Sequence, residues 1–75
     1  MRKKDPVLVA LGHSVRKRRE AKRLTQEVLA EKTGLDRTYI SDIERGTRNV
    51  SILNVVRVAR ALGSSLSEIT QAVDQ

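Results

Sequence analysis

Apolar residues recur every three or four positions along most of the chain, which is the spacing of helices that bury one face. In residues 7–22, Leu8, Leu11 and Val15 fall on one stripe, and this stripe ends in basic residues that include Arg19. The pattern predicts a first helix at about 7–22 and gives no reason to expect strands.

Residues suited to helix ends divide the rest of the chain. Side chains that favour the N-cap position stand before each apolar-periodic segment: Thr25, Asp36, Ser51 and Ser65. Glycines suited to a left-handed helix end follow three of these segments: Gly34, Gly46 and Gly63. The predicted helices span about 25–33, 36–45 and 51–62. A short fifth helix follows Ser65, which has the capping-box spacing to Glu68.

A length of 75 residues allows one small domain with little room for a deep substrate cavity. We therefore expect a single all-α domain of five helices at residues 7–75, preceded by a flexible basic arm at residues 1–6. The arm holds Arg2, Lys3 and Lys4, which are able to reach a DNA minor groove. A solvated tail is the interpretation that we favour for them.

The charge of the chain favours a polyanionic partner. The net charge is +6, and nine of the fifteen Lys and Arg residues lie in residues 1–23, against two acidic residues there. There is no cysteine and only one histidine, His13, on a polar stretch where a solvated side chain is expected. We expect no metal, no cofactor and no small-molecule ligand.

Enzymatic chemistry has little support in the sequence. It shows no nucleophile-base pair and no phosphate-binding loop, and its glycines look like isolated helix stops. No apolar run approaches the roughly 20 residues that a bilayer requires, and no signal peptide is recognisable. We expect a bacterial, cytoplasmic protein that is not an enzyme and does not bind a membrane.

Residues 25–49, TQEVLAEKTGLDRTYISDIERGTRN, contain two short helical patterns separated by a Gly-Leu step. This is how a helix-turn-helix looks in sequence, and in such motifs the second helix enters the major groove of DNA. The helical periodicity turns Ile40 and Ile43 inward. The outward polar positions and their flank are the predicted base contacts: Arg37, Thr38, Tyr39 and Ser41. The alternative is a solvated helix face with Tyr39 half in the core.

Phosphate contacts are predicted at both ends of this motif. Gln26 opens the first of its two helices, where backbone N–H groups already favour an anion; the alternative is an ordinary solvated glutamine. Hydrogen-bond donors also follow the second helix: Arg45, Arg48 and Asn49. Contacts of this kind fix the register on DNA and make binding salt-sensitive.

These residues carry a family resemblance. Residues 11–62, through LGHSVRKRREAKRLTQEVLAEKTGLDRTYISDIERGTRN, resemble the Cro/repressor-type helix-turn-helix family, and the I-x-x-I-E-R-G step at 40–46 is part of that match. The resemblance implies a compact, lambda-repressor-like DNA-binding domain that grips inverted repeats as pairs. It also implies Gln26 and Asn49 on phosphate, with 37–39 toward the bases. The segment LDRTYISDIERGTRNVS is similar to controller proteins of restriction-modification systems.

The resemblance also implies a structural ion pair, because the first-helix arginine of the family commonly pairs with the glutamate of the I-E-R-G step. Here these residues are Arg19 and Glu44, and the helical periodicity of both segments places them at the core edge. Two positions depart from the family pattern. Arg18 stands where relatives usually have leucine, and Arg23 where they often have glycine.

The segment 52–62 has more apolar residues than one small core can easily cover. A homodimer interface on the last two helices would bury the surplus, and we predict that it includes Leu53, Val56, Arg60, Leu66 and Ile69. The alternative is a helix that is simply central to its own bundle.

Charge, motif, polar reading face and dimer surface together indicate a sequence-specific transcription regulator. The predicted partner is double-stranded DNA, bound by a homodimer on a pseudo-palindromic operator. The sequence leaves the choice between activation and repression open. The alternative function is a protein-interaction module, such as an antitoxin-like or anti-repressor partner, because the fold can be reused without DNA.

Overall fold

The computed structural model describes residues 5–74, and within them it contains helices and no strands. The elements in chain order are α1 (Pro6–Ala21), α2 (Gln26–Thr33), α3 (Arg37–Arg45), α4 (Ile52–Ala61), α5 (Leu66–Thr70) and a 3₁₀ helix η1 (Gln71–Asp74). The five predicted α-helices are confirmed, with their ends within about a turn of expectation, and η1 was not predicted. The basic-arm positions Arg2, Lys3 and Lys4 lie outside the described residues.

All of the predicted N-caps form. The side chains of Thr25, Asp36, Ser51 and Ser65 each accept a hydrogen bond from a backbone N–H in the first turn of the following helix. The capping box is complete, because Glu68 also accepts from the Ser65 backbone N–H at 2.8 Å. Hydrogen bonds from Ser65 lower the pKa of Glu68. Asp5, which the sequence pattern did not single out, caps α1 in the same way.

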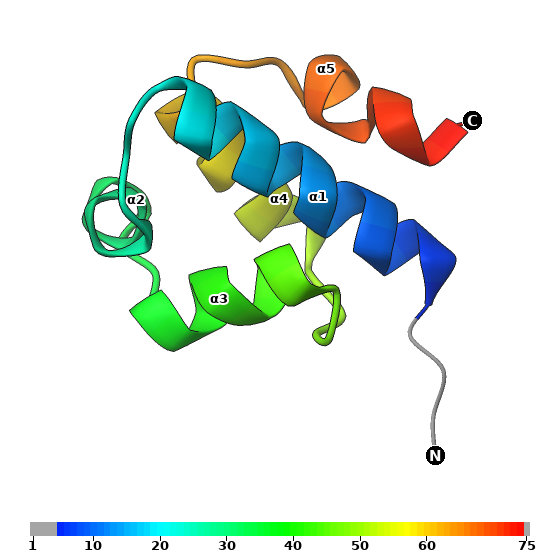
Figure 1. Ribbon diagram of the computed structural model, residues 1–75, viewed down its shortest axis with the longest axis horizontal. Helices are drawn as coiled ribbons and strands as arrows, with labels where there is room; N and C mark the ends of the chain where they lie inside the picture. Colours follow the sequence, from blue (N-terminus) through cyan, green and yellow to red (C-terminus); the bar gives the residue numbers. More distant parts are fainter. Residues whose placement is uncertain (1–4, 75) are drawn as a thin grey trace.

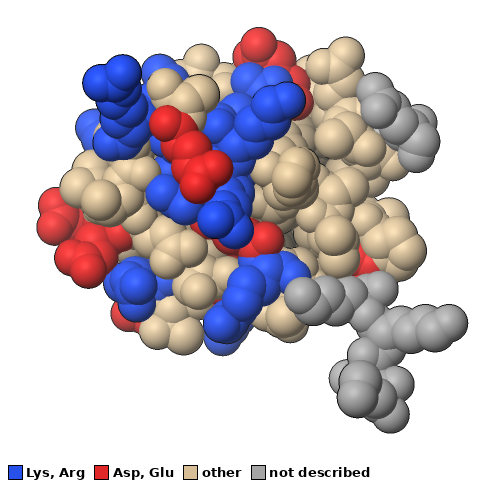
Figure 2. All heavy atoms as spheres, viewed as in Figure 1, with Lys and Arg blue, Asp and Glu red and all other residues tan. Residues whose placement is uncertain are grey.

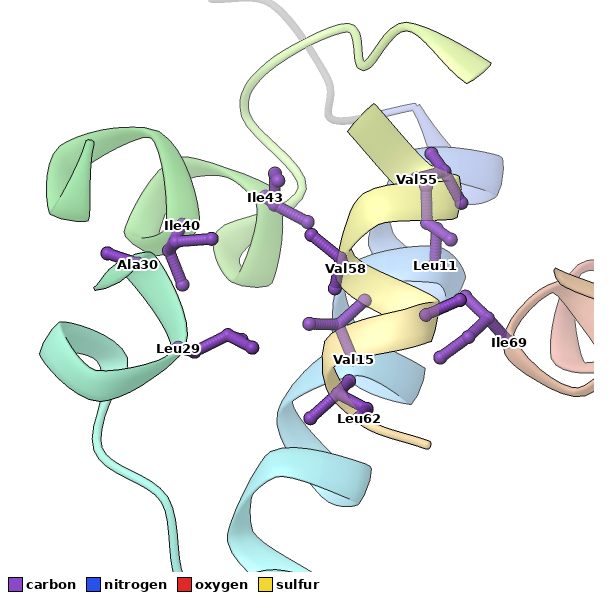
Figure 3. Close-up of a cluster of buried hydrophobic side chains, with 11 residues drawn as sticks. Leu11, Val15, Leu29, Ala30, Ile40, Ile43, Val55, Val58, Leu62 and Ile69 are labelled. Atoms are coloured by element: carbon purple, nitrogen blue, oxygen red, sulfur yellow. The ribbon is translucent and has the colours of Figure 1, made fainter. Parts of the chain in front are cut away.

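Helix α1 organises the domain. It packs against α3 on one side and against α5 and η1 on another, while α2 packs on α3 and α4 (Figure 1). The core is drawn from all five α-helices (Figure 3). Its largest fully buried side chains are Leu29, Ile40, Leu62, Ile69, Val15 and Val58. Val28 of α2, by contrast, is exposed.

Gly12 corrects the expectation that the glycines are only helix stops. It lies inside α1 at the crossing with α3, where an added Cβ would stand 2.2 Å from the carbonyl oxygen of Ile43. Only a residue without a side chain allows the two backbones to approach this closely. The short distance between α1 and α3 therefore depends on Gly12, and it determines how α3 is held against the domain.

The two departures from the family pattern have local explanations. The Arg18 guanidinium donates to Ser64 Oγ at 3.3 Å and to the Glu68 carbonyl at 3.2 Å, so it ties α1 to α5. Arg23 adopts the left-handed conformation, with φ 57°, directly after the end of α1. The turn geometry typical of glycine is therefore kept by a residue with a side chain.

Candidate DNA-binding interface

Helices α2 and α3 form the expected helix-turn-helix. Only residues 34–36 separate them, and Gly34 makes the turn with φ 72°. Figure 1 shows α2 end-on and α3 from the side, so the two helices cross steeply. Ile40 and Ile43 are buried and anchor α3 against the domain. The opposite face of α3 carries the exposed Arg37, Thr38 and Arg45.

The predicted base contacts are not equally accessible. Arg37 and Thr38 are exposed at the start of α3, and Ser41 is half-buried. The Arg37 Nε lies 3.9 Å from Glu27 Oε1, and both side chains are more than half exposed. An exposed pair of this kind contributes little, so the Arg37 side chain is free to reorient toward a partner.

Tyr39 has a more constrained position than the other three. It is half-buried and packs against the core. Its hydroxyl accepts a hydrogen bond from Asn54 Nδ2 at 3.0 Å, which joins α3 to α4. Tyr39 is therefore half in the core, as the alternative interpretation expected. Its contact with bases stays a prediction.

Arg19 and Glu44 form the predicted ion pair. The Arg19 Nε lies 2.6 Å from Glu44 Oε2 and its Nη2 3.0 Å from Glu44 Oε1, a two-point contact between α1 and α3. The exposed fractions of the two side chains are only 12% and 3%. The hydrogen bond to Glu44 raises the pKa of Arg19. Arg19 Nη1 also donates to the Leu24 carbonyl at 2.7 Å, which fixes the loop before α2.

Gln26 joins this ion pair. Its Nε2 donates to Glu44 Oε1 at 3.1 Å, and the side chain is half-buried. The Glu44 carboxylate thus orients the Gln26 side chain, which is not an ordinary solvated residue. An amide nitrogen carries two hydrogens, so a second N–H remains for a phosphate. That contact stays a prediction.

The predicted phosphate contacts after α3 are organised by one carboxylate. We call this group the Asp42 cluster, and it consists of Asp42, Arg45, Arg48 and Tyr39. Asp42 Oδ1 accepts from Arg45 Nη2, and Asp42 Oδ2 accepts from Arg48 Nε at 3.2 Å. The Arg48 guanidinium also lies over the Tyr39 ring, 4.9 Å from its centre. Asn49 is exposed in the following loop.

The sequence pattern did not single out Asp42. Its spacing of three residues to Arg45 is a recognisable helical pair, but the contact to Arg48 depends on the turn at Gly46. On the face shown in Figure 2, basic side chains gather over the C-terminal half of α1, with an acidic side chain among them, and along the edge formed by α3; acidic side chains also lie over α2.

The residues of the predicted dimer surface are only partly exposed to solvent. Leu53 and Arg60 are exposed and Val56 is half-buried; with Ile52, they share one face of α4. Ile52 and Leu53 are 66% and 59% exposed, the highest values among the large apolar side chains of the described residues. Leu66 is half-buried and packs against the core.

Ile69 was wrongly assigned to the dimer surface. It is 0% exposed within its own core, because α5 turns this side chain toward the rest of the domain. The helical pattern identified Ile69 as a residue to be buried, but it could not say by which chain.

Other kinds of site would require a metal-binding group, a membrane-spanning helix or a surface groove in the part of the chain that the structure describes. No group of three or more acidic or histidine side chains is placed to hold a metal ion there. None of the helices at residues 5–74 is long and apolar enough to cross a bilayer. A shallow groove between α1 and α5 is lined by His13, Lys17, Arg18 and neighbouring residues.

Comparison with known proteins assigns this geometry to a family. The family model described as Helix-turn-helix matches residues 15–69. Control protein C.MunI from a Mycoplasma species is 39% identical over 72 residues, which cover 95% of this chain and 97% of that protein. The restriction-modification controller protein C.AhdI from Aeromonas hydrophila has a crystal structure that matches with a TM-score of 0.81 and 47% identity, over 83% of this chain and 94% of that one.

A further solved structure contains DNA. It is the tetramer of the restriction-modification controller protein C.Esp1396I in complex with its natural 35 base-pair operator. Its TM-score is 0.82 at 33% identity, covering 95% of this chain and 99% of that one. The present chain therefore belongs to the helix-turn-helix family and is related to the control proteins of restriction-modification systems.

Proposed function

We propose that this protein is a sequence-specific DNA-binding transcription regulator that acts as a homodimer. The observation that carries the proposal is the two-sided character of α3. Ile40 and Ile43 fix its inner face in the core, while Arg37 and Thr38 stand in solvent at its N-terminal end. A helix held in this way presents side chains to base edges without having to be ordered on binding.

The contacts divide into two kinds. Arg37, Thr38, Ser41 and, from its flank, Tyr39 face the bases, with the Arg37 guanidinium suited to a two-point contact with guanine. The residues at both ends of the motif contact phosphates: Gln26, Arg45, Arg48 and Asn49. Contacts of the first kind specify sequence, and those of the second set register and salt dependence.

The dimer forms through α4, with Leu53, Val56 and Arg60, together with Ile52 and the neighbouring Leu66. Two exposed apolar side chains next to each other are costly in water, and a two-fold contact between copies would cover both pairs. In such a dimer one α3 per subunit enters successive major grooves about 34 Å apart, so the operator is a pseudo-palindrome.

The relatives support a place for the protein in a restriction-modification system, where it would bind DNA near its own gene. The controller C.Esp1396I was solved on its natural operator, and C.MunI matches nearly the whole chain. On this proposal the protein works in the cytoplasm, is not an enzyme and needs no cofactor. The dimer equilibrium then sets how much of the operator is occupied at a given protein concentration.

The test is fluorescence-anisotropy titration of labelled DNA from upstream of the gene, against a shuffled duplex, at about 0.15 M salt. We expect a preference of roughly a thousandfold or more. Arg37→Ala should weaken operator binding by about 1 to 3 kcal/mol and relax base preference. The control Arg16→Ala, on the exposed face of α1, should leave operator affinity and base preference unchanged.

Weak and equal binding of both duplexes, for that DNA and for any duplex selected from a random library, would overturn the proposal. A protein that copurifies in a fixed ratio would then favour the protein-interaction module. Intact affinity and base preference in Arg37→Ala would mean that α3 is not the reading helix.

A further inference from the structure

One carboxylate lies between two of the arginines that the proposed function assigns to phosphates. Asp42 uses both of its oxygens, one for Arg45 and one for Arg48. Its side chain is only 16% exposed, whereas those of Arg45 and Arg48 are 60% and 49% exposed. The acid therefore lies beneath the two guanidinium groups and leaves their outer edges to solvent.

Arg48 is held from a second side as well. Its guanidinium lies over the Tyr39 ring, and the Tyr39 hydroxyl is fixed by Asn54 of α4. The main chain of Asp42 contributes separately to the same turn, since its carbonyl accepts from the Thr47 N–H at 3.1 Å. The loop that follows α3 is thus held in place in the free protein by its contacts with Asp42 and Tyr39. These contacts also set the positions of Arg45 and Arg48.

We propose that Asp42 is a positioning residue that sets the ratio of specific to non-specific DNA binding. It acts through Arg45 and Arg48 and does not itself contact DNA. This inference rests on the proposed function.

The physical argument compares two kinds of DNA complex. Non-specific affinity depends almost wholly on how many phosphate charges the protein neutralises, and a carboxylate next to two arginines subtracts from that charge. In the specific complex, α3 is seated in the groove and the directions of the two arginines matter, so ordering them beforehand saves entropy on binding. Asp42 thus weakens the first kind of complex and favours the second.

The experiment measures wild type, Asp42→Asn and Asp42→Glu on two duplexes between about 50 and 200 mM salt, the range over which phosphate contacts alter affinity most visibly. One duplex is selected from a random-sequence library by the wild-type protein, and the other is its shuffled counterpart. The matched control is Glu20→Gln. It removes one negative charge and also breaks a contact with an arginine, Arg16, on the exposed face of α1.

Asp42→Asn is expected to bind the shuffled duplex several-fold more tightly, with a salt slope steeper by up to about one. Its affinity for the selected duplex should stay level or fall, so the specificity ratio drops by about tenfold. Asp42→Glu keeps the charge but moves it by one methylene, so it should weaken only the selected complex. Glu20→Gln should leave the ratio unchanged. Circular dichroism of each variant is the check that it is folded.

Equal tightening on both duplexes in Asp42→Asn would overturn the inference, because Asp42 would then be only a charge. An unchanged affinity of Asp42→Asn for the shuffled duplex, with an unchanged salt slope, would also overturn it, because the carboxylate would then not subtract from the charge offered to phosphates. Failure of the proposed function is distinguishable from both, because the wild type would then select no preferred duplex.

Discussion

The ion pair between Arg19 and Glu44 allows a sharp prediction about stability. Replacing Glu44 by Gln keeps the size of the side chain and removes its charge. The change leaves the Arg19 guanidinium without a counter-charge at a position where its side chain is only 12% exposed. The Gln26 side chain at the same time loses the carboxylate oxygen to which it donates, and keeps at most a weaker amide acceptor. The perturbation is therefore electrostatic and confined to the contacts of one buried carboxylate.

Removing the charge of one partner in a buried ion pair lowers the free energy of unfolding by about 3 to 5 kcal/mol. A domain of this length has a free energy of unfolding of about 4 to 11 kcal/mol, from about 0.05 to 0.15 kcal/mol per residue. Glu44→Gln is thus expected to remove between about a quarter and all of the stability. The side chains of Arg16 and Glu20 are more than half exposed in their pair, so breaking it with Glu20→Gln should cost less than about 1 kcal/mol.

The assay is urea unfolding of wild type, Glu44→Gln and Glu20→Gln, followed by far-ultraviolet circular dichroism. Protein concentration must be the same in all three, because dimerisation shifts apparent stability. We expect a difference of at least about 2 kcal/mol between the two variants, from the ranges for buried and exposed pairs. Coincident unfolding curves for the two variants would refute the reasoning.

Three further predictions concern backbone and cap positions. Gly12→Ala should lower the free energy of unfolding by at least about 1 to 3 kcal/mol, because its Cβ would meet backbone of α3; an unchanged urea midpoint would contradict this. Arg23→Gly should raise the melting temperature by a few degrees, since it relieves up to about 1 kcal/mol of left-handed strain, and a lower melting temperature would argue against it. Glu68 contributes stability above its ordinary pKa of 4.5, and this is lost as pH falls through its lowered folded-state pKa. The difference in melting temperature between wild type and Glu68→Gln should therefore shrink on going from about pH 7 to about pH 3, and a constant difference would speak against the cap.

The elements were predictable because their signals are local. A capping side chain, a periodic apolar face and a glycine at the end are all contained in ten to twelve neighbouring residues, so Asp36 and Gly46 were enough to delimit α3. The exposed face of α3 could be predicted for the same reason, since Ile40 and Ile43 define which side of one helix is buried.

Other features depend on contacts between distant segments, and there the sequence fell short. Gly12 reads as an ordinary small residue until α3 lies across it. Ile69 was correctly identified as buried, but periodicity cannot distinguish a core from a dimer interface. The Arg48 contact with Asp42 requires the chain to reverse after Gly46, which no residue spacing encodes.

The buried ion pair has a further consequence for the proposed interface. Burying two charges is no efficient way to gain stability, because the cost of desolvation offsets most of the attraction. What Glu44 does provide is direction. Its two oxygens meet Arg19 from α1 and Gln26 from α2, while Glu44 itself belongs to α3. Three helices are thus fixed relative to one another through one carboxylate. Because Gln26 is a predicted phosphate contact, we interpret this pair as the device that aligns it with α3, so that register on DNA and the geometry of the fold depend on the same carboxylate.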